Sequence, residues 1–89
     1  KVKTYSLSQN YPNPFNPSTT IDFEVAKSGM VTLKVFDVLV GEIMTLVNEM
    51  KEAGKHSISF DASNLPSGVY FYKLQSGDFV TSKKMVLVK

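Results

Sequence analysis

The sequence predicts an all-β fold, a small antiparallel β-sandwich of about seven strands. Apolar and polar residues alternate in several short stretches, as in strands with one buried face. Gly, Pro, Asn and Asp residues that favour turns separate these stretches at regular intervals. The chain has 89 residues, of which 43% are hydrophobic and 20% charged, enough for one small globular core. Such a core leaves little room for a catalytic cleft, so we expect no enzyme.

An extended, turn-rich lead-in opens the chain. Residues 10–18 contain three prolines, each of which lacks an amide donor and disfavours helical geometry in the residue before it. Two parts are therefore expected: a lead-in at residues 1–18 and the β-sandwich at residues 19–89.

The first half of the sandwich begins with a hairpin. Residues 19–25 alternate strictly, which predicts a strand with one wet face, and residues 31–35 alternate after a short turn. Residues 43–50 are ambiguous, because their apolar side chains also fit helical spacing. Strands on both sides favour a strand at residues 43–47 followed by a loop.

Three further strands complete the sandwich. Residues 56–60 alternate again, and a turn cluster rich in Asp, Asn, Ser, Pro and Gly follows at residues 61–68. Residues 69–74 are almost wholly apolar or aromatic, which predicts a central strand covered on both faces. Residues 79–88 form the last strand. This pattern is typical of an immunoglobulin-like sandwich.

Charge and composition exclude several classes of function. All ten basic residues are lysines, and the chain also has eight carboxylates. The resulting net charge of +2 is spread along the chain. Nucleic-acid binding is therefore not expected, because it relies on clustered charge and arginine forks. The chain has no cysteine, which excludes disulfides and thiol nucleophiles. No apolar run approaches the roughly 20 residues that span a bilayer.

Candidate catalytic and metal-binding residues are few. His56 has no further ligands at a defined spacing, so an exposed, solvated histidine is expected. Asp22 and Glu24 fall on the wet face of a strand, and Glu49 and Glu52 fall in the expected polar loop, where all four favour solubility.

The sequence offers two further candidate binding sites. Asp61 and Asn64 offer oxygen ligands for calcium, but the calcium-loop motif is absent, and we expect no metal and no cofactor. The aromatic residues 70–72 cannot form one sugar-binding platform, because consecutive strand residues point to opposite faces. Only the member on the outer face is a candidate for such contact.

The end of the chain supports two interpretations. Lys83 and Lys84 precede an apolar run at residues 85–88, and Lys89 closes the chain. The lysines fit an edge strand protected against edge-to-edge pairing, or a recognition tag. An exposed apolar edge at residues 85–88 also favours weak self-association through the last strand.

Several segments together resemble one known family. Residues 7–21 read LSQNYPNPFNPSTTI and are similar to the opening of the type A C-terminal sorting domains of the type IX secretion system, also named the Por secretion system. Four later segments follow in the order found in that family. They read VTLKVFD, AGKH, LPSGVYFY and KMVLVK, and the resemblance extends over about the whole chain.

The resemblance implies a secretion signal and not an enzyme. It implies a terminal domain that directs a larger cargo protein through the periplasm and across the outer membrane, to the cell surface or beyond. The implied partners are the type IX translocon, a surface sortase-like peptidase that removes the domain, and the N-terminal cargo. The motif residues carried over are Pro66, Gly68, Tyr70, Lys84 and Lys89. The alternative is a non-catalytic accessory module, either carbohydrate-binding and adhesive or a structural spacer.

Overall fold

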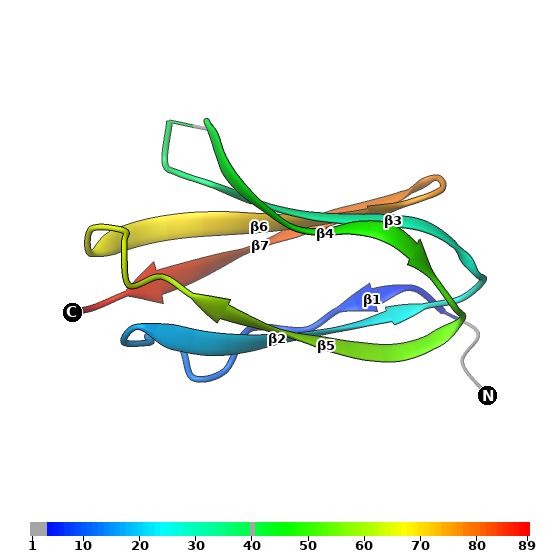
Figure 1. Cartoon of the computed structure of the whole chain (residues 1–89), viewed down its shortest axis with the longest axis horizontal. Helices are drawn as coiled ribbons and strands as arrows, with labels where there is room; N and C mark the ends of the chain where they lie inside the picture. Colours follow the sequence, from blue (N-terminus) through cyan, green and yellow to red (C-terminus); the bar gives the residue numbers. More distant parts are fainter. Residues whose placement is uncertain (1–3, 40) are drawn as a thin grey trace.

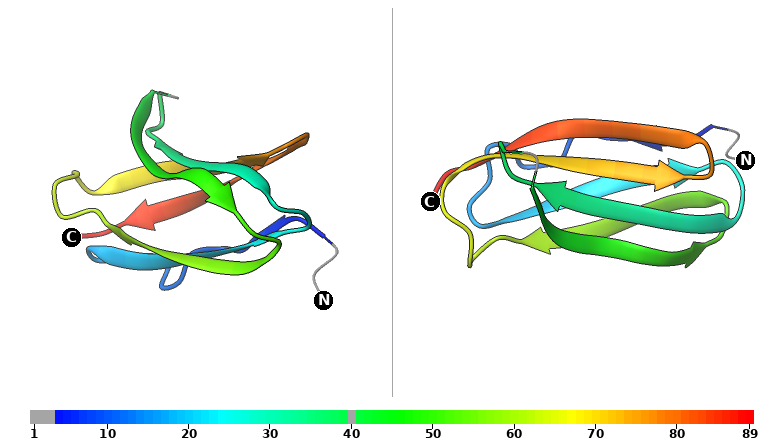
Figure 2. Two further views of the ribbon diagram at one scale, coloured as in Figure 1. Left: turned by 45° about the vertical axis from the view of Figure 1, so that its right-hand side comes forward. Right: turned by 90° about the horizontal axis from the view of Figure 1, so that it is seen from above.

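The computed structural model describes residues 4–39 and 41–89, which form an antiparallel β-sandwich of two sheets (Figure 1). One sheet has three strands in the order β1-β2-β5, and the other has four in the order β4-β3-β6-β7 (Figure 2). The strands are β1 Ser6–Leu7, β2 Ser18–Val25, β3 Gly29–Phe36, β4 Glu42–Lys51, β5 Gly54–Asp61, β6 Gly68–Ser76 and β7 Phe79–Leu87. The predicted fold class is confirmed.

Alternating residues from both sheets form one core. The inward residues of β2 and β3 are fully or almost fully buried, as the alternation predicts. The apolar ones are Ile21, Phe23, Val25, Val31, Leu33 and Val35, and Thr19 is the polar one. Tyr72 and Leu74 of β6 complete the centre of this core, and Met85 and Leu87 of β7 close one side.

The ambiguous segment forms a strand, but the loop expected after residue 47 is wrong. β4 continues to Lys51, which pairs with Gly29 across the β3–β4 ladder. Two register shifts in this ladder leave Ile43 and Leu46 without a partner residue. Each extra residue of a bulge shifts the inward-outward alternation by one position. The apolar residues of β4 therefore fall at a spacing that resembles a helix.

β6 lies inside its sheet, but the expectation that both its faces are covered is wrong. Its inward residues Tyr70, Tyr72 and Leu74 are buried, whereas Val69 and Phe71 on the other face are half-buried. Within the described part of the chain, no further layer covers that face of the four-stranded sheet (Figures 1 and 2). β6 is therefore central only in the sense that it lies between β3 and β7 within its sheet.

The lead-in packs onto the sandwich and closes part of its edge. Phe15 is 2% exposed, with its ring centroid 6.1 Å from that of Phe60. Its backbone donates to the carbonyl of Val86 at 2.9 Å and accepts from the amide of Val88 at 3.0 Å. The expected exposed apolar edge at residues 85–88 is therefore wrong, because this stretch of β7 is already paired. The division at residue 18 stays a prediction, although both parts share one core.

No helix within residues 4–39 and 41–89 is long and apolar enough to cross a membrane.

Candidate functional site

The loop between β5 and β6 and the end of β7 lie at the same end of the sandwich (Figure 1), and they carry Pro66, Gly68 and Lys89. Pro66 and Gly68 lie between β5 and β6, and Lys89 follows β7. Tyr70 is the third residue of β6, and Lys84 lies in β7, where it pairs with Phe71. The motif residues thus lie in neighbouring elements, and their side chains have different contacts.

Tyr70 and Pro66 are joined across the turn that leads into β6. The Tyr70 hydroxyl donates a hydrogen bond of 2.6 Å to the carbonyl of Pro66, four residues earlier. This is the tyrosine corner of immunoglobulin-like sandwiches, in which a tyrosine at the start of a strand fixes the preceding loop. Gly68, between them, has a φ of +155°, which L side chains rarely adopt. Three motif residues thus shape one turn.

Lys89 is tied to the same loop from the other side. Its ammonium group donates to the carbonyl of Ser63 at 2.6 Å, and its backbone amide donates to the hydroxyl of Ser67 at 3.0 Å. The loop holds itself as well, because the Asp61 carboxylate accepts from the amide and hydroxyl of Ser63. These bonds from Ser63, with the nearby charge of Lys89, lower the pKa of Asp61. Lys89 therefore has an intramolecular partner.

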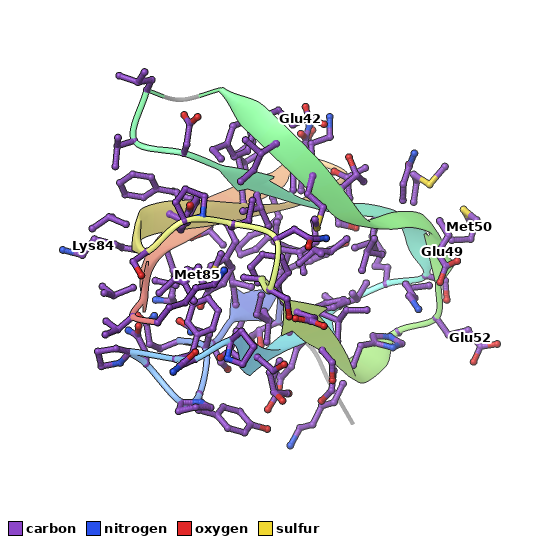
Figure 3. All side chains as sticks on the ribbon, turned by 60° about the vertical axis from the view of Figure 1, so that its left-hand side comes forward. Glu42, Glu49, Met50, Glu52, Lys84 and Met85 are labelled. Atoms are coloured by element: carbon purple, nitrogen blue, oxygen red, sulfur yellow. The ribbon has the colours of Figure 1, made fainter. Side chains whose placement is uncertain are left out.

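Lys84 differs, because its side chain is exposed and points away from the sandwich (Figure 3). Figure 3 shows Glu49 and Glu52 on the opposite side of the molecule. Among the described residues, Lys84 makes no ion pair within 4.0 Å. Its backbone carbonyl accepts a 2.7 Å hydrogen bond from the Gln9 side chain, so the lead-in holds the strand while the ammonium group stays in solvent.

A buried polar network beneath the lead-in was not predicted from the sequence. Asn10 is 2% exposed, and its side-chain amide donates to Thr19 Oγ1 at 3.0 Å and to the Pro12 carbonyl at 3.2 Å. The Tyr72 hydroxyl accepts from the Asn10 amide and donates to the Ser8 carbonyl, both at 2.7 Å. Prolines remove backbone donors, so side chains must satisfy the carbonyls around them, which is the signal that could have identified Asn10.

Burial changes the acidity of this network. Desolvation raises the pKa of Tyr72 to about 12, although the hydrogen bond from the Asn10 amide acts in the opposite direction. Tyr72 is therefore neutral across the physiological range and serves as both donor and acceptor. The arrangement locks the lead-in to β6.

His56 is not the exposed, solvated histidine that was expected. It is half-buried on the inward face of β5, because it pairs with Phe23 of β2. The two rings stack with centroids 5.4 Å apart, and Nε2 lies 2.8 Å from the Glu52 carbonyl. The imidazole thus packs against the edge of the core.

Three of the candidate carboxylates lie in strands, Asp22 and Glu24 in β2 and Glu49 in β4. Asp22 and Glu24 lie on the outward face of β2, as expected, where Asp22 accepts hydrogen bonds from Ser57 and from the Tyr11 hydroxyl. Glu49 lies within β4 and not in the expected loop, because that strand is longer. Within the described part of the chain, no three His, Cys, Asp or Glu residues are grouped in a way that could hold a metal ion.

The aromatic residues of β6 divide between the faces as expected. Tyr70 and Tyr72 are buried, and Phe71 lies on the outer face beside Phe36 of β3. Phe36, Phe71, Lys73 and Ser82 line a shallow hollow of about 270 Å³. Two candidate sites thus emerge. One is the hydrogen-bonded end of the sandwich at the β5–β6 loop and Lys89, and the other is the outer face of β6 with its hollow.

Comparisons with known proteins address both fold and family. The family described as "Secretion system C-terminal sorting domain" matches residues 9–89 of the chain. No curated protein matches it. A crystal structure of dimeric latent PorU from Porphyromonas gingivalis matches with a TM-score of 0.71 at 17% identity, over 98% of this chain and 10% of that chain. At this identity the likeness shows the fold alone, and the chain spans a tenth of that PorU chain.

The family match begins within the lead-in and continues through every later strand. It therefore includes all the motif residues described above. The chain belongs to the family of secretion system C-terminal sorting domains, which are sorting signals for type IX secretion.

Proposed function

We propose that this domain is the exported tail of a larger cargo protein and that the outer-membrane translocon recognises it in its folded form. The observation that carries the proposal is the bracing of the motif residues by their own fold. Pro66 and Tyr70 hold each other, and Lys89 holds the loop before them. A signal read as an unfolded peptide would need none of these bonds, whereas a signal read as a surface requires them.

The proposal divides the motif residues by role. Pro66, Gly68 and Tyr70 shape the turn into β6 and act through folding. Lys89 anchors the chain end to the loop. Lys84 and Lys89 are both exposed and outside any ion pair of the described residues, but only the Lys89 ammonium group has a hydrogen-bond partner there, so Lys84 serves as the contact with the translocon.

After export, a sortase-like peptidase removes the domain at the cell surface. Peptidases bind their substrates in extended, accessible form. Residues 6–18 are not free to extend, although residues 11–14 are exposed, because β1 pairs with β2, Asn10 is buried in a hydrogen-bonded network and Phe15 lies in the core. Cleavage is therefore placed on the N-terminal side of β1. Mass spectrometry of the released cargo would test this, since a cut within residues 6–18 would contradict it.

The division of roles has a direct test in single variants. Lys84→Gln should reduce export of a fused reporter while leaving the thermal midpoint unchanged. Lys89→Gln should lower the midpoint, because it removes the bond to Ser63. Lys27→Gln, at an exposed turn lysine, is the matched control and should change neither. Undiminished export of a folded Lys84→Gln variant would overturn the role given to Lys84.

A further inference from the structure

The two outer faces of the sandwich have opposite character. The outward residues of β2 and β5 are Ser18, Thr20, Asp22, Glu24, Lys55, Ser57, Ser59 and Asp61, all polar or charged. The outward face of β3, β6 and β7 instead carries two aromatic residues, Phe36 and Phe71, and a valine pair, Val69 and Val86. Exposure to water is therefore more favourable for the outer face of β2 and β5 than for the outer face of β3, β6 and β7.

The second face is hollowed at its aromatic pair. Phe36 and Phe71 are neighbours in the β3–β6 register, and the hollow of about 270 Å³ opens between them and the β7 residue Ser82. Lys73 reaches over the Phe36 ring, with Nζ 5.4 Å from the centroid. Such a contact leaves the ammonium group at the rim, available to an anion.

Positive charge surrounds this hollow. Lys73 of β6 is the register partner of Lys34 of β3. Lys84 of β7 is the register partner of Phe71 of β6. Glu42 pairs with Phe36 in the β3–β4 register and lies 3.4 Å from the Lys34 ammonium group. Asp37, which follows Phe36, accepts hydrogen bonds from the amides of Leu39 and Gly41. Among the described residues, Lys73 and Lys84 have no carboxylate within 4.0 Å. Two lysines outside any ion pair of the described residues, Lys73 and Lys84, thus border an apolar floor.

We infer that this face docks an acidic segment of a partner protein, with an apolar side chain of that segment in the Phe36–Phe71 hollow and its carboxylates on Lys73 and Lys84. The inference rests on the proposed function, in which the partner belongs to the export machinery. Charge complementarity identifies the occupant, because paired surfaces place opposite charges together.

A neutral glycan fits this face less well than an acidic peptide. Sugars need several hydroxyl partners around an aromatic platform, whereas Ser82 is the one uncharged polar residue lining the hollow. A peptide with alternating acidic and apolar side chains matches both the lysines and the apolar floor. The two ligands also respond differently to salt, because only the peptide depends on ion pairing.

A nuclear magnetic resonance titration of the isolated chain tests the inference. The probe is a short synthetic peptide that alternates Glu and Leu, and its control alternates Gln and Leu. We expect the Glu peptide to shift the resonances of Phe36, Phe71, Lys73, Ser82 and Lys84. In the Lys73→Gln/Lys84→Gln variant its dissociation constant should rise by roughly three- to thirtyfold, the loss of two exposed ion pairs. Lys27→Gln/Lys55→Gln removes the same charge elsewhere and should change nothing.

Three results would overturn the inference. They are shifts confined to other faces, equal binding of the Gln peptide, and shifts on this face from a neutral oligosaccharide in place of the peptide. Export of a reporter fused to each variant separates this inference from the proposed function. If the wild-type fusion is exported and the Lys73→Gln/Lys84→Gln fusion is exported equally, the docking face is refuted and sorting stands. If the wild-type fusion itself is not exported, the proposed function fails whatever the peptide does.

Discussion

The hydroxyl of Tyr72 accepts a 2.7 Å hydrogen bond from the backbone amide of Asn10, 62 residues earlier in the chain. This bond joins the centre of the four-stranded sheet to the proline-rich lead-in. Together with the bond from the same hydroxyl to Ser8, it makes the lead-in a structural part of the domain.

Replacing Tyr72 with Phe should destabilise the domain. The change leaves the Asn10 amide and the Ser8 carbonyl without their partner, while the ring still fills the core. An unsatisfied buried group costs about 1–3 kcal/mol, so the free energy of unfolding should fall by about that amount. Urea denaturation at neutral pH measures it. Tyr11→Phe is the control, because that hydroxyl bonds Asp22 at the surface; equal stability of Tyr72→Phe and Tyr11→Phe would contradict the buried network.

The same residue predicts a pH dependence at high pH. Tyr72 has a pKa of about 12 in the folded domain, against 10.0 for a free tyrosine. Below pH 10 both states hold the proton, and the contribution to stability is complete. As pH rises from 10 through 12 the unfolded state releases its proton first, so this contribution is lost. The stability difference between wild type and Tyr72→Phe should therefore shrink over this window, and a constant difference would argue against the raised pKa.

Gly68→Ala should lower the thermal midpoint through backbone strain alone. A Cβ at this position meets no atom within 4 Å, but the φ of +155° is rarely adopted by L residues. Such strain costs about 1–3 kcal/mol. Gly29→Ala is a matched control, because its Cβ would also meet nothing within 4 Å and its φ is outside the strained range. If both variants melt at the same temperature, the turn does not require glycine.

Asn13→Ala should open the edge of β7 locally. The Asn13 side chain accepts the amide of Val86 at 3.0 Å, and Phe15 separately accepts the amide of Val88 at 3.0 Å. Removing Asn13 should speed hydrogen exchange at Val86 by about two- to tenfold, the worth of one hydrogen bond. Val88 should exchange as before and serves as the internal reference. Unchanged exchange at Val86 would show that the lead-in does not protect this edge.

The strands were predictable wherever one face of the strand is buried and the ladder is regular. Residues 19–25 and 31–35 alternate because each inward position enters the same core. β4 could not be predicted in full, because its two bulges hide the alternation. The open outer face of β6 was also hidden, since Val69 and Phe71 are apolar without being buried.

The candidate site was predictable as a set of residues but not as an arrangement. Sequence motifs identify Pro66, Tyr70 and Lys89, yet the bonds that relate them to the loop depend on the path of the chain in space. The backbone bridge between Phe15 and Leu87 spans most of the chain, and no local pattern encodes such a contact. It is nevertheless what changes the last strand from an open edge into a partly closed one.

The most direct test of the account is the export of a fluorescent reporter fused to residues 1–89. The fusion would be expressed in a bacterium with an intact type IX system and in a translocon-deficient sibling strain. We predict a folded reporter at the cell surface or in the medium of the intact strain and periplasmic retention in the sibling. A folded, soluble reporter retained in the periplasm of both strains would contradict it.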